Sequence, residues 1–318
     1  MRTHISNIVS GVLCALGLAL LAVPSIALAD GLAVKPAALP ASVKTSLESE
    51  IAAAKTSKRD LRDRVRDVQG VKPEVYKQAQ NPVPEASREL VRLGKDALVP
   101  MLEALAFDAP QRTLAANEAE ALTIGMLHAV GKIRDAKSSP VLRAVFDAQS
   151  SSTPVAVAAA VALGQLCGDA ERSALEGQLA EGKPLRQAAV AGLAECRNAD
   201  AVTLLAPLSK DQTASIRKEA VKALGTVGAA WAWKAKGDAK AAEALMVRNA
   251  AASALLDAWL ANADIRTEAK RAMLRTESTT LLANVKKAKN AATDADVVTA
   301  LAALEKSLEK QAKRATRN

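Results

Sequence analysis

A repeat of nearly constant stride runs through the middle of the chain, and it limits the fold more than any other feature. Its clearest mark is a series of leucines, Leu163, Leu193, Leu224 and Leu255, and a looser copy lies upstream around Val130. Apolar or small residues recur eight, four and three positions before each leucine. These offsets trace one face of an α-helix. Each segment is therefore predicted to form one amphipathic helix, and the constant stride indicates that the helices stack as similar units.

The residues between these helices predict a second set of helices. Leu142, Leu175 and Leu205 stand at the same distance past the ends of three predicted helices, and Pro154 and Pro184 suit the first turn of the helix that follows. Half of the residues are hydrophobic but only 2% are aromatic, so alanine, a strong helix former, supplies much of the apolar content. After residue 29, no run of alternating apolar and polar residues predicts a strand. The expected fold class is all-α.

Three of the predicted helices open on an apolar residue followed by an arginine, at Arg186, Arg217 and Arg248. Small residues and a leucine follow, and a glycine stands directly after Leu224 and after Leu163 of the repeat before Arg186. Together with the pairing of helices in each repeat, this pattern resembles the HEAT repeat of the short bacterial type over residues 85–262. The resemblance implies an α-solenoid, which is a superhelix of antiparallel helix pairs.

The resemblance also implies a ladder in which an acidic residue about six positions before each arginine binds arginines along the stack. Asp211 stands six positions before Arg217, as this pattern requires. Glu181 and Glu243 stand five positions before the other two arginines, and Ala156 replaces an arginine in the preceding repeat. A row of arginines at one height could also hold an anionic ligand. The structural ladder is the preferred interpretation.

The chain is expected to contain four segments. They are a signal peptide (1–29), an N-terminal linker and helical cap (30–84), the repeat array (85–262), and a C-terminal helical cap with a basic tail (263–318). Residues 30–41, which contain two prolines, are expected to be a flexible lead-in. After Leu224 the pattern becomes irregular, and Trp231 and Trp233 stand where leucines are expected.

Residues 1–29 have the layout of a secretory signal peptide. A short basic head precedes an apolar run, and Ala27 and Ala29 supply the small residues of a cleavage site before Asp30. The alternative is an uncleaved inner-membrane anchor through residues 8–29, a stretch nearly long enough to span a bilayer. The helix-breaking Pro24 favours cleavage. We therefore expect an exported protein that is periplasmic or secreted.

Cys167 and Cys196 lie outside the signal segment, at near-equivalent places in adjacent repeats. An oxidising compartment would allow them to form a disulfide. Neighbouring helix axes are about 8–10 Å apart, which is wide for a disulfide. The preferred interpretation is that both cysteines are small buried hydrophobic residues.

The sequence offers little for catalysis. Outside the signal segment it has one histidine, His128, with no Cys-x-x-Cys pair and no Gly-x-Ser-x-Gly turn. The usual zinc sites and a hydrolase serine therefore have no support. The position of His128 in its repeat predicts a partly exposed helix residue. We expect a protein that is not an enzyme and that has no catalytic residues, no metal and no cofactor.

Binding is better supported than catalysis. The segment from Val155 to Leu163 is apolar on all sides, so one side of this helix faces something other than its partner helix. We expect Val157 and Val161 to line a shallow groove for a partner. Polar residues are expected to continue this groove, namely Gln187, Lys218, Lys222 and Asn249. The alternative is that the small side chains tolerate exposure and nothing docks there.

The formal net charge of +9 would suit nucleic acid, but the predicted export and the scarcity of aromatic residues for base stacking argue against it. The positive charge is spread over Lys58, Arg59, Arg62, Arg64 and Arg66 and over the tail from Lys306 to Arg317. We expect a monomeric scaffold or adaptor that binds a protein partner in the cell envelope. Two alternatives are a binder of anionic envelope polymers or lipid head groups and, by similarity to the HEAT-like phycobilin lyases, a chromophore-handling enzyme.

Overall fold

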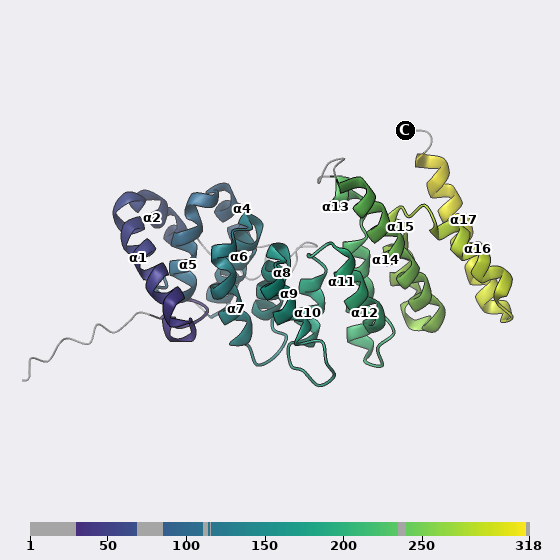
Figure 1. Cartoon of the computed structure of the whole chain (residues 1–318), viewed down its shortest axis with the longest axis horizontal. Coiled ribbons are helices and arrows are strands. Elements are labelled where there is room, and N and C mark those ends of the chain that lie inside the picture. Colours follow the sequence, from purple (N-terminus) through teal and green to yellow (C-terminus); the bar gives the residue numbers. More distant parts are fainter. Residues whose placement is uncertain (1–29, 69–84, 111–113, 115, 235–239, 316–318) are drawn as a thin grey trace, which may run out of the picture.

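The computed structural model describes residues 30–68, 85–110, 114, 116–234 and 240–315. Every regular element within these residues is a helix, so the expected all-α class is confirmed. The helices follow one another along the longest axis of the molecule, from α1 at one end to α17 at the other (Figure 1). None of the described helices is both long enough and apolar enough to cross a lipid bilayer.

The helices of the middle region fall into two rows. In the first row each helix packs against the next, in the order α4 (Glu85–Arg92), α6 (Ala116–Ile133), α8 (Pro154–Leu166), α10 (Arg186–Leu193), α12 (Ala214–Val227) and α15 (Arg266–Thr276). The second row packs against the first and contains α5 (Leu98–Ala106), α7 (Ser139–Asp147), α9 (Asp169–Glu176), α11 (Ala199–Leu208) and α14 (Ala241–Ala261).

The remaining elements lie at the ends and in the connections. At the N-terminal end, α1 (Ala41–Ser57) and α2 (Arg59–Asp67) pack on α5. At the C-terminal end, α16 (Leu281–Ala291) contacts α14, and α17 (Ala295–Ala315) contacts α15 and α16. The short helices are α13 (Ala230–Lys234) and the 3₁₀ turns Pro36–Ala38, Lys95–Ala97, Ala136–Ser138 and Ala263–Ile265.

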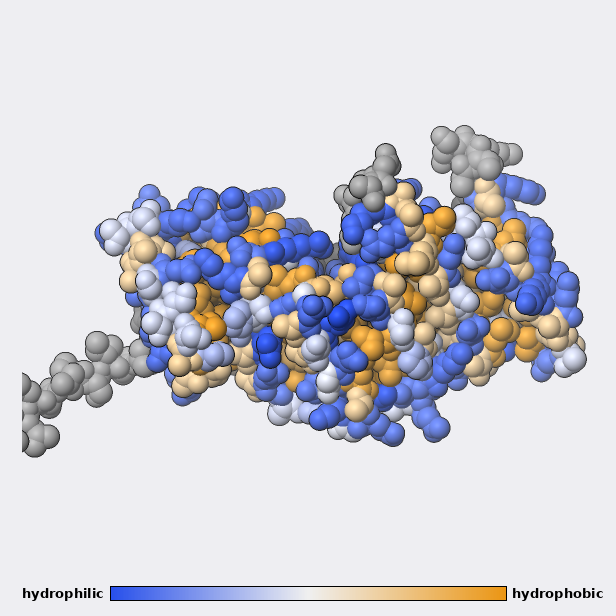
Figure 2. Space-filling model, viewed as in Figure 1, coloured by the Kyte–Doolittle hydropathy of each residue, from blue (hydrophilic) through white to orange (hydrophobic). Residues whose placement is uncertain are grey.

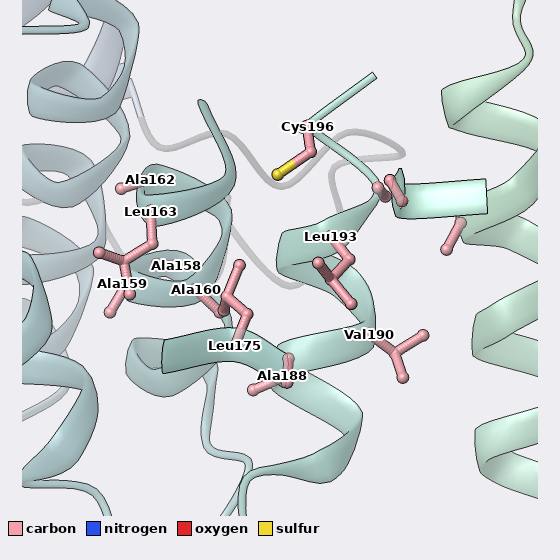
Figure 3. Close-up of a cluster of buried hydrophobic side chains, with 14 of the residues drawn as sticks. Ala158, Ala159, Ala160, Ala162, Leu163, Leu175, Ala188, Val190, Leu193 and Cys196 are labelled. Carbon is pink, nitrogen blue, oxygen red and sulfur yellow. The ribbon is translucent and has the colours of Figure 1, made fainter. Parts of the chain in front are cut away.

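Small residues bring the first-row helices close together. A Cβ atom on Gly164 of α8 would overlap the main-chain oxygen of Gly192 in α10. The alanines around this contact, among them Ala158, Ala160 and Ala188, are almost fully buried (Figure 3). Because backbone rather than long side chains forms much of this contact, alanine and glycine are required where a core ordinarily has bulky residues.

The predicted helical face is confirmed for α8, α10 and α12, whose residues Leu163, Leu193 and Leu224 are fully buried. The first-row helices α6, α8, α10 and α15 also end alike, because a residue with positive φ stands four positions after the last core residue. These residues are Arg134, Cys167, Arg197 and Glu277, with φ between 46° and 58°. A left-handed residue at this position is a common helix terminator.

The prediction that the segment from Val247 to Leu255 continues the first row is wrong. This segment belongs to α14, which packs against α11 in the second row as well as against α12 and α15. The first-row successor of α12 is α15, and Gly225 of α12 faces Ala272 of α15. Helices of both rows bury apolar residues at the same sequence offsets, so periodicity alone does not assign a helix to a row.

The prediction of a flexible lead-in at residues 30–41 is also wrong. The main-chain N–H groups of Leu32, Ala33 and Val34 donate to the last carbonyl groups of α5, at 2.9–3.2 Å. Val34 and Leu39 are each 6% exposed. A helix end leaves carbonyl groups without partners, and here the preceding chain segment satisfies them.

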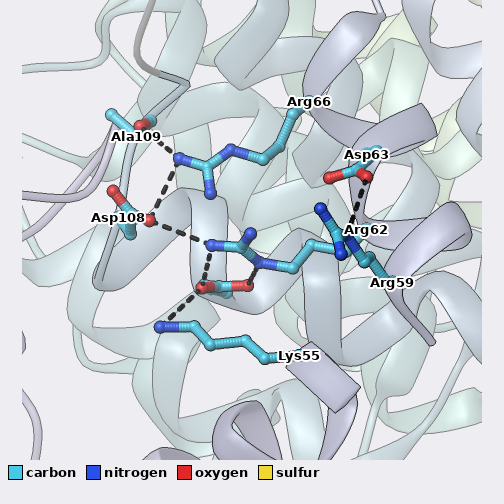
Figure 4. A network of polar contacts seen from close by, with 8 residues as sticks. Lys55, Arg59, Arg62, Asp63, Arg66, Asp108 and Ala109 are labelled. Atoms are coloured by element: carbon cyan, nitrogen blue, oxygen red, sulfur yellow. Dashed lines mark hydrogen bonds and ion pairs between the residues drawn. The ribbon is translucent and has the colours of Figure 1, made fainter. Parts of the chain in front are cut away.

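A buried ion network fixes α2 to α5 (Figure 4). Glu103 is 3% exposed and accepts two hydrogen bonds from Arg62, at 2.7 and 2.8 Å. Asp108 pairs with Arg62 at 3.1 Å and with Arg66 at 3.0 Å. The hydrogen bond to Glu103 raises the pKa of the Arg62 guanidinium. Two of the cations that the sequence assigned to a basic surface are therefore neutralised inside the fold.

Candidate interaction face

Five of the predicted groove residues lie on the side of their first-row helices that is opposite the buried face. Val157 and Val161 of α8 are half-buried, whereas Gln187 of α10 and Lys218 and Lys222 of α12 are exposed. All five occupy positions six or two before the last core leucine of their helix. Because those positions lie opposite the buried stripe of a helix, the residues form one continuous strip, which we call the outward strip.

Asn249 does not belong to this strip, and its assignment to the groove is wrong. It lies on α14 in the second row, where its side-chain oxygen accepts a hydrogen bond from the Ser278 hydroxyl at 2.7 Å. Its amide nitrogen lies 3.5 Å from the Thr279 hydroxyl. Asn249 therefore holds the connection between α15 and α16.

The chemistry of the outward strip changes along the row. The strip is apolar at Val157 and Val161, neutral and polar at Gln187, and cationic at Lys218 and Lys222. The equivalent position of α15 is Arg271, which is also exposed. Figure 2 shows apolar side chains at the surface between helices and hydrophilic residues over much of the outer edge formed by α16 and α17. A partner that fits the strip needs both an apolar and an acidic portion.

The first arginine of the predicted ladder is bound by an acidic residue of the next repeat. Arg186 forms a bidentate ion pair with Asp211, and its Nε donates to the main-chain oxygen of Leu179 at 2.6 Å. Burial alone would raise the pKa of Asp211. Hydrogen bonds from Arg186 and from the Thr213 main chain outweigh this effect, so the pKa lies below its ordinary value.

The other two arginines bind main-chain carbonyl groups. Arg217 donates to the carbonyl oxygen of Asp211 and pairs with Asp264 at 2.8 Å. Arg248 donates to the carbonyl oxygens of Thr276 and Glu277 at the end of α15. These contacts replace the expected pairs of Arg186 with Glu181 and of Arg248 with Glu243. The contacts favour a structural ladder over a row of arginines that is free for a ligand.

Sequence reasoning missed Arg266, which occupies the equivalent place in α15. Its Nε lies 3.4 Å from the carbonyl oxygen of Trp259, seven positions earlier in the sequence. The Nε of Arg186 contacts the carbonyl oxygen of Leu179 at the same sequence spacing. Its guanidinium carbon lies 4.7 Å from the centroid of the Trp259 ring, a cation–π geometry. The pair Ile265-Arg266 repeats the apolar-arginine start, but it lies 49 positions after Arg217 and 18 after Arg248, and neither distance matches the stride of the leucine series. A search at that stride therefore passes over it.

Cys167 and Cys196 form a disulfide, so the preferred interpretation of two unpaired cysteines is wrong. Both residues lie beyond the last core leucine of their helices, and Cys167 is the left-handed cap residue of α8. Their Cα atoms are 5.2 Å apart, well inside the range for a disulfide. The spacing between helix axes was the wrong measure, because the chain leaves the helices at these positions and approaches its neighbour.

The two tryptophans after α12 have opposite environments. Trp233 is 3% exposed and its indole N–H donates to the Val227 carbonyl oxygen at 2.8 Å. Trp231 is 63% exposed, so its assignment to a core leucine position is wrong. The Arg197 guanidinium carbon lies 5.5 Å from the centroid of the Trp231 ring. Tryptophan and arginine are among the residue types most often found at binding hot spots.

The remaining predicted positions add no chemistry. His128 is half-buried on α6, and its burial lowers the pKa of the imidazole. No group of three or more histidine, cysteine, aspartate or glutamate side chains that could hold a metal ion lies among the described residues. Ala27 and Ala29 fall outside the described residues. Asp30 is exposed and pairs with Lys35 at 3.0 Å.

No protein family and no curated protein sequence match this chain significantly.

Proposed function

We propose that the protein is an exported, non-catalytic α-solenoid of HEAT-like helix pairs that serves as a scaffold or adaptor for a protein partner in the cell envelope. The outward strip carries the proposal. It offers an apolar portion on α8 and a cationic portion on α12, on helices whose opposite face is fixed in the core. A rigid strip of this kind binds with little loss of conformational entropy. The partner's contact segment is acidic and carries apolar side chains.

The disulfide supports export. Structural disulfides persist in oxidising compartments and are rare in the cytosol. Cys167 and Cys196 are joined across two first-row helices, so the bond is part of the fold and supports an oxidising compartment for the chain from Asp30 onward.

Trp231 and Arg197 are a second proposed contact for the partner. Arg197 is also held by Glu195 at 3.1 Å and follows the disulfide residue Cys196. A tryptophan that is 63% exposed buries a large apolar area when a partner covers it. We therefore expect Trp231 to contribute to partner binding although it contributes little to folding.

The experiment compares crosslinked partners in the native cell envelope for the wild type and for a Val157→Glu, Val161→Glu variant. Two negative charges on the apolar part of the strip repel an acidic segment and remove its apolar contact, so the crosslinked partner is expected to disappear. The control variant is Ala250→Glu, Ser253→Glu, which adds the same charge to exposed positions of α14 in the second row.

The control is expected to keep the wild-type crosslinks, and circular dichroism is expected to show unchanged helix content in both variants. If the Val157→Glu, Val161→Glu variant folds and keeps every wild-type crosslink, the outward strip is not the binding surface. Equal loss in both variants would show a general effect of charge and would also contradict the proposal.

A second candidate function is the binding of an anionic envelope surface, and the exposed cations of the first row favour it. Lys218 and Lys222 on α12 are followed by Arg271 and Arg275 on α15, and all four are exposed. Binding of this kind weakens as salt screens the charges. Cosedimentation with anionic vesicles that does not change with added salt would rule it out.

A further inference from the structure

A cleft of about 610 Å³ lies where the regular packing of the first row ends. The last helix, α17, packs chiefly against α16, and it reaches α15 through Gln311, whose side-chain nitrogen donates to the Leu274 carbonyl oxygen at 2.6 Å. The space between α15, α16 and α17 is left open beside this hydrogen bond. Its volume falls within the range typical of small-molecule sites.

The walls of the cleft differ in chemistry. One part is apolar and is formed by Met273, Leu281, Leu282 and Leu308. Met273, Leu281 and Leu308 are buried and held by the core, while Leu282 is partly exposed and lies at the edge. This part of the wall offers a preformed apolar surface to a ligand.

Other lining residues of the cleft carry cations and hydroxyl groups. Lys234 at the end of α13 and Arg248 of α14 line it together with Ser278 and Thr279. The one acidic lining residue is Glu277, whose carboxylate lies 4.0 Å from Arg248. Two cations and one carboxylate leave a net positive charge among the lining side chains.

The Arg248 side chain is held in place, but one of its guanidinium nitrogens makes no hydrogen bond to the described residues. Its Nε and Nη2 donate to the carbonyl oxygens of Thr276 and Glu277, and its side chain is 19% exposed. Its Nη1 has no hydrogen-bond partner in the described part of the chain. A guanidinium held in place by two hydrogen bonds and facing a cleft is preorganised to bind a carboxylate or phosphate oxygen.

The hydroxyl groups beside it are also held in place. Asn249, the residue next to Arg248, accepts from the Ser278 hydroxyl at 2.7 Å and lies 3.5 Å from that of Thr279. This contact explains why an amide, and not an apolar residue, stands on this side of α14. It fixes the loop that carries the polar wall.

We propose that this cleft binds an amphipathic anion, with its carboxylate or phosphate head at Arg248 and Lys234 and its hydrocarbon chain along Leu282, Leu308 and Met273. The inference goes beyond the scaffold function, because the cleft lies apart from the outward strip of α8 to α12. Either a free long-chain carboxylate or a single-chain lipid phosphate has the required chemistry.

Isothermal titration calorimetry of the chain from Asp30 onward tests the proposal with four probes: palmitate, a single-chain lysophosphatidate, hexadecanol and inorganic phosphate. Saturable binding of palmitate or lysophosphatidate is expected, and the tighter of the two identifies the head group. Hexadecanol lacks the charge and phosphate lacks the chain, so each is expected to bind much more weakly. The proposal is overturned if neither amphipathic anion binds, or if phosphate or hexadecanol binds as tightly.

Two variants locate the site. Lys234→Glu reverses one exposed cation of the cleft and is expected to weaken binding by about three- to tenfold. Lys287→Glu makes the same change at an exposed position of α16 outside the cleft and, as the matched control, is expected to leave binding unchanged. Leu282→Asn removes an apolar contact at the edge of the cleft, and a loss of about tenfold is expected. Equal loss in the two lysine variants, or wild-type binding by Leu282→Asn, would place the ligand elsewhere.

Discussion

Removing the disulfide is expected to lower the free energy of unfolding substantially. The bond joins residues 29 apart in sequence, and it closes a loop that contains α9 and α10. In the chain-entropy description, a closed loop of that length corresponds to about 3.6 kcal/mol at 25 °C. The perturbation is the double variant Cys167→Ala, Cys196→Ala, in which neither sulfur is left to pair with another molecule.

Urea unfolding followed by circular dichroism measures this effect in the chain from Asp30 onward, which leaves out Cys14. For an ordinary dependence of stability on urea, the midpoint is expected to fall by about 1 to 2 M. A reductant is expected to lower the midpoint of the wild type by a similar amount and to leave the double variant unchanged. Two titratable thiols in the oxidised protein, or a midpoint that reduction does not move, would show that no stabilising bond joins these cysteines.

Three further predictions test other parts of the structure. Gly164→Ala is expected to destabilise the protein by about 1–3 kcal/mol in thermal unfolding, because the new Cβ overlaps the next helix. This cost outweighs the better helix propensity of alanine. The control Gly177→Ala, at an exposed helix end, is expected to leave the stability nearly unchanged. Asp211→Asn is expected to destabilise the protein at neutral pH. Because folding lowers the pKa of Asp211, its carboxylate contributes to the free energy of unfolding above the ordinary aspartate pKa, and this contribution is lost as the pH falls through the lowered pKa. The stability difference between variant and wild type should therefore shrink on acidification, and a constant difference would contradict this role of Asp211. Trp233→Ala is expected to cost about 3–5 kcal/mol, whereas Trp231→Ala should unfold like the wild type and lose partner crosslinks.

The sequence predicts the first-row helices well because their signal is local. A buried stripe recurs at fixed offsets, and Leu163, Leu193 and Leu224 are buried as those offsets require. The same signal fails for Leu255, which is buried equally well in the second row. Row assignment depends on contacts between distant segments, and α13 and the long α14 move the next first-row helix to Arg266.

The candidate site was predictable only in part. Val157, Val161, Gln187, Lys218 and Lys222 stand six or two positions before a core leucine, and these two positions place them on the same face of their helices. The environment of an aromatic residue in an irregular segment has no such pattern, and two tryptophans spaced two apart on a helix point in different directions.

The disulfide and the cleft could not be derived from repeat spacing. Cys167 and Cys196 meet because the chain leaves its helices there. The left-handed residues at these helix ends are arginine, cysteine and glutamate, so no residue type marks them in the sequence. The cleft depends on how α17 departs from the row. No periodicity describes this departure, since the repeat ends before it.

Small-angle X-ray scattering of the chain from Asp30 onward tests most directly whether the two rows of helices extend in one direction without a common centre. A compact globular chain of this length has a radius of gyration of about 19 Å. Two extended rows are expected to give a clearly larger value and a pair-distance distribution with a long tail. A radius of gyration no larger than that of the compact chain, with a symmetric distribution, would contradict the arrangement in rows.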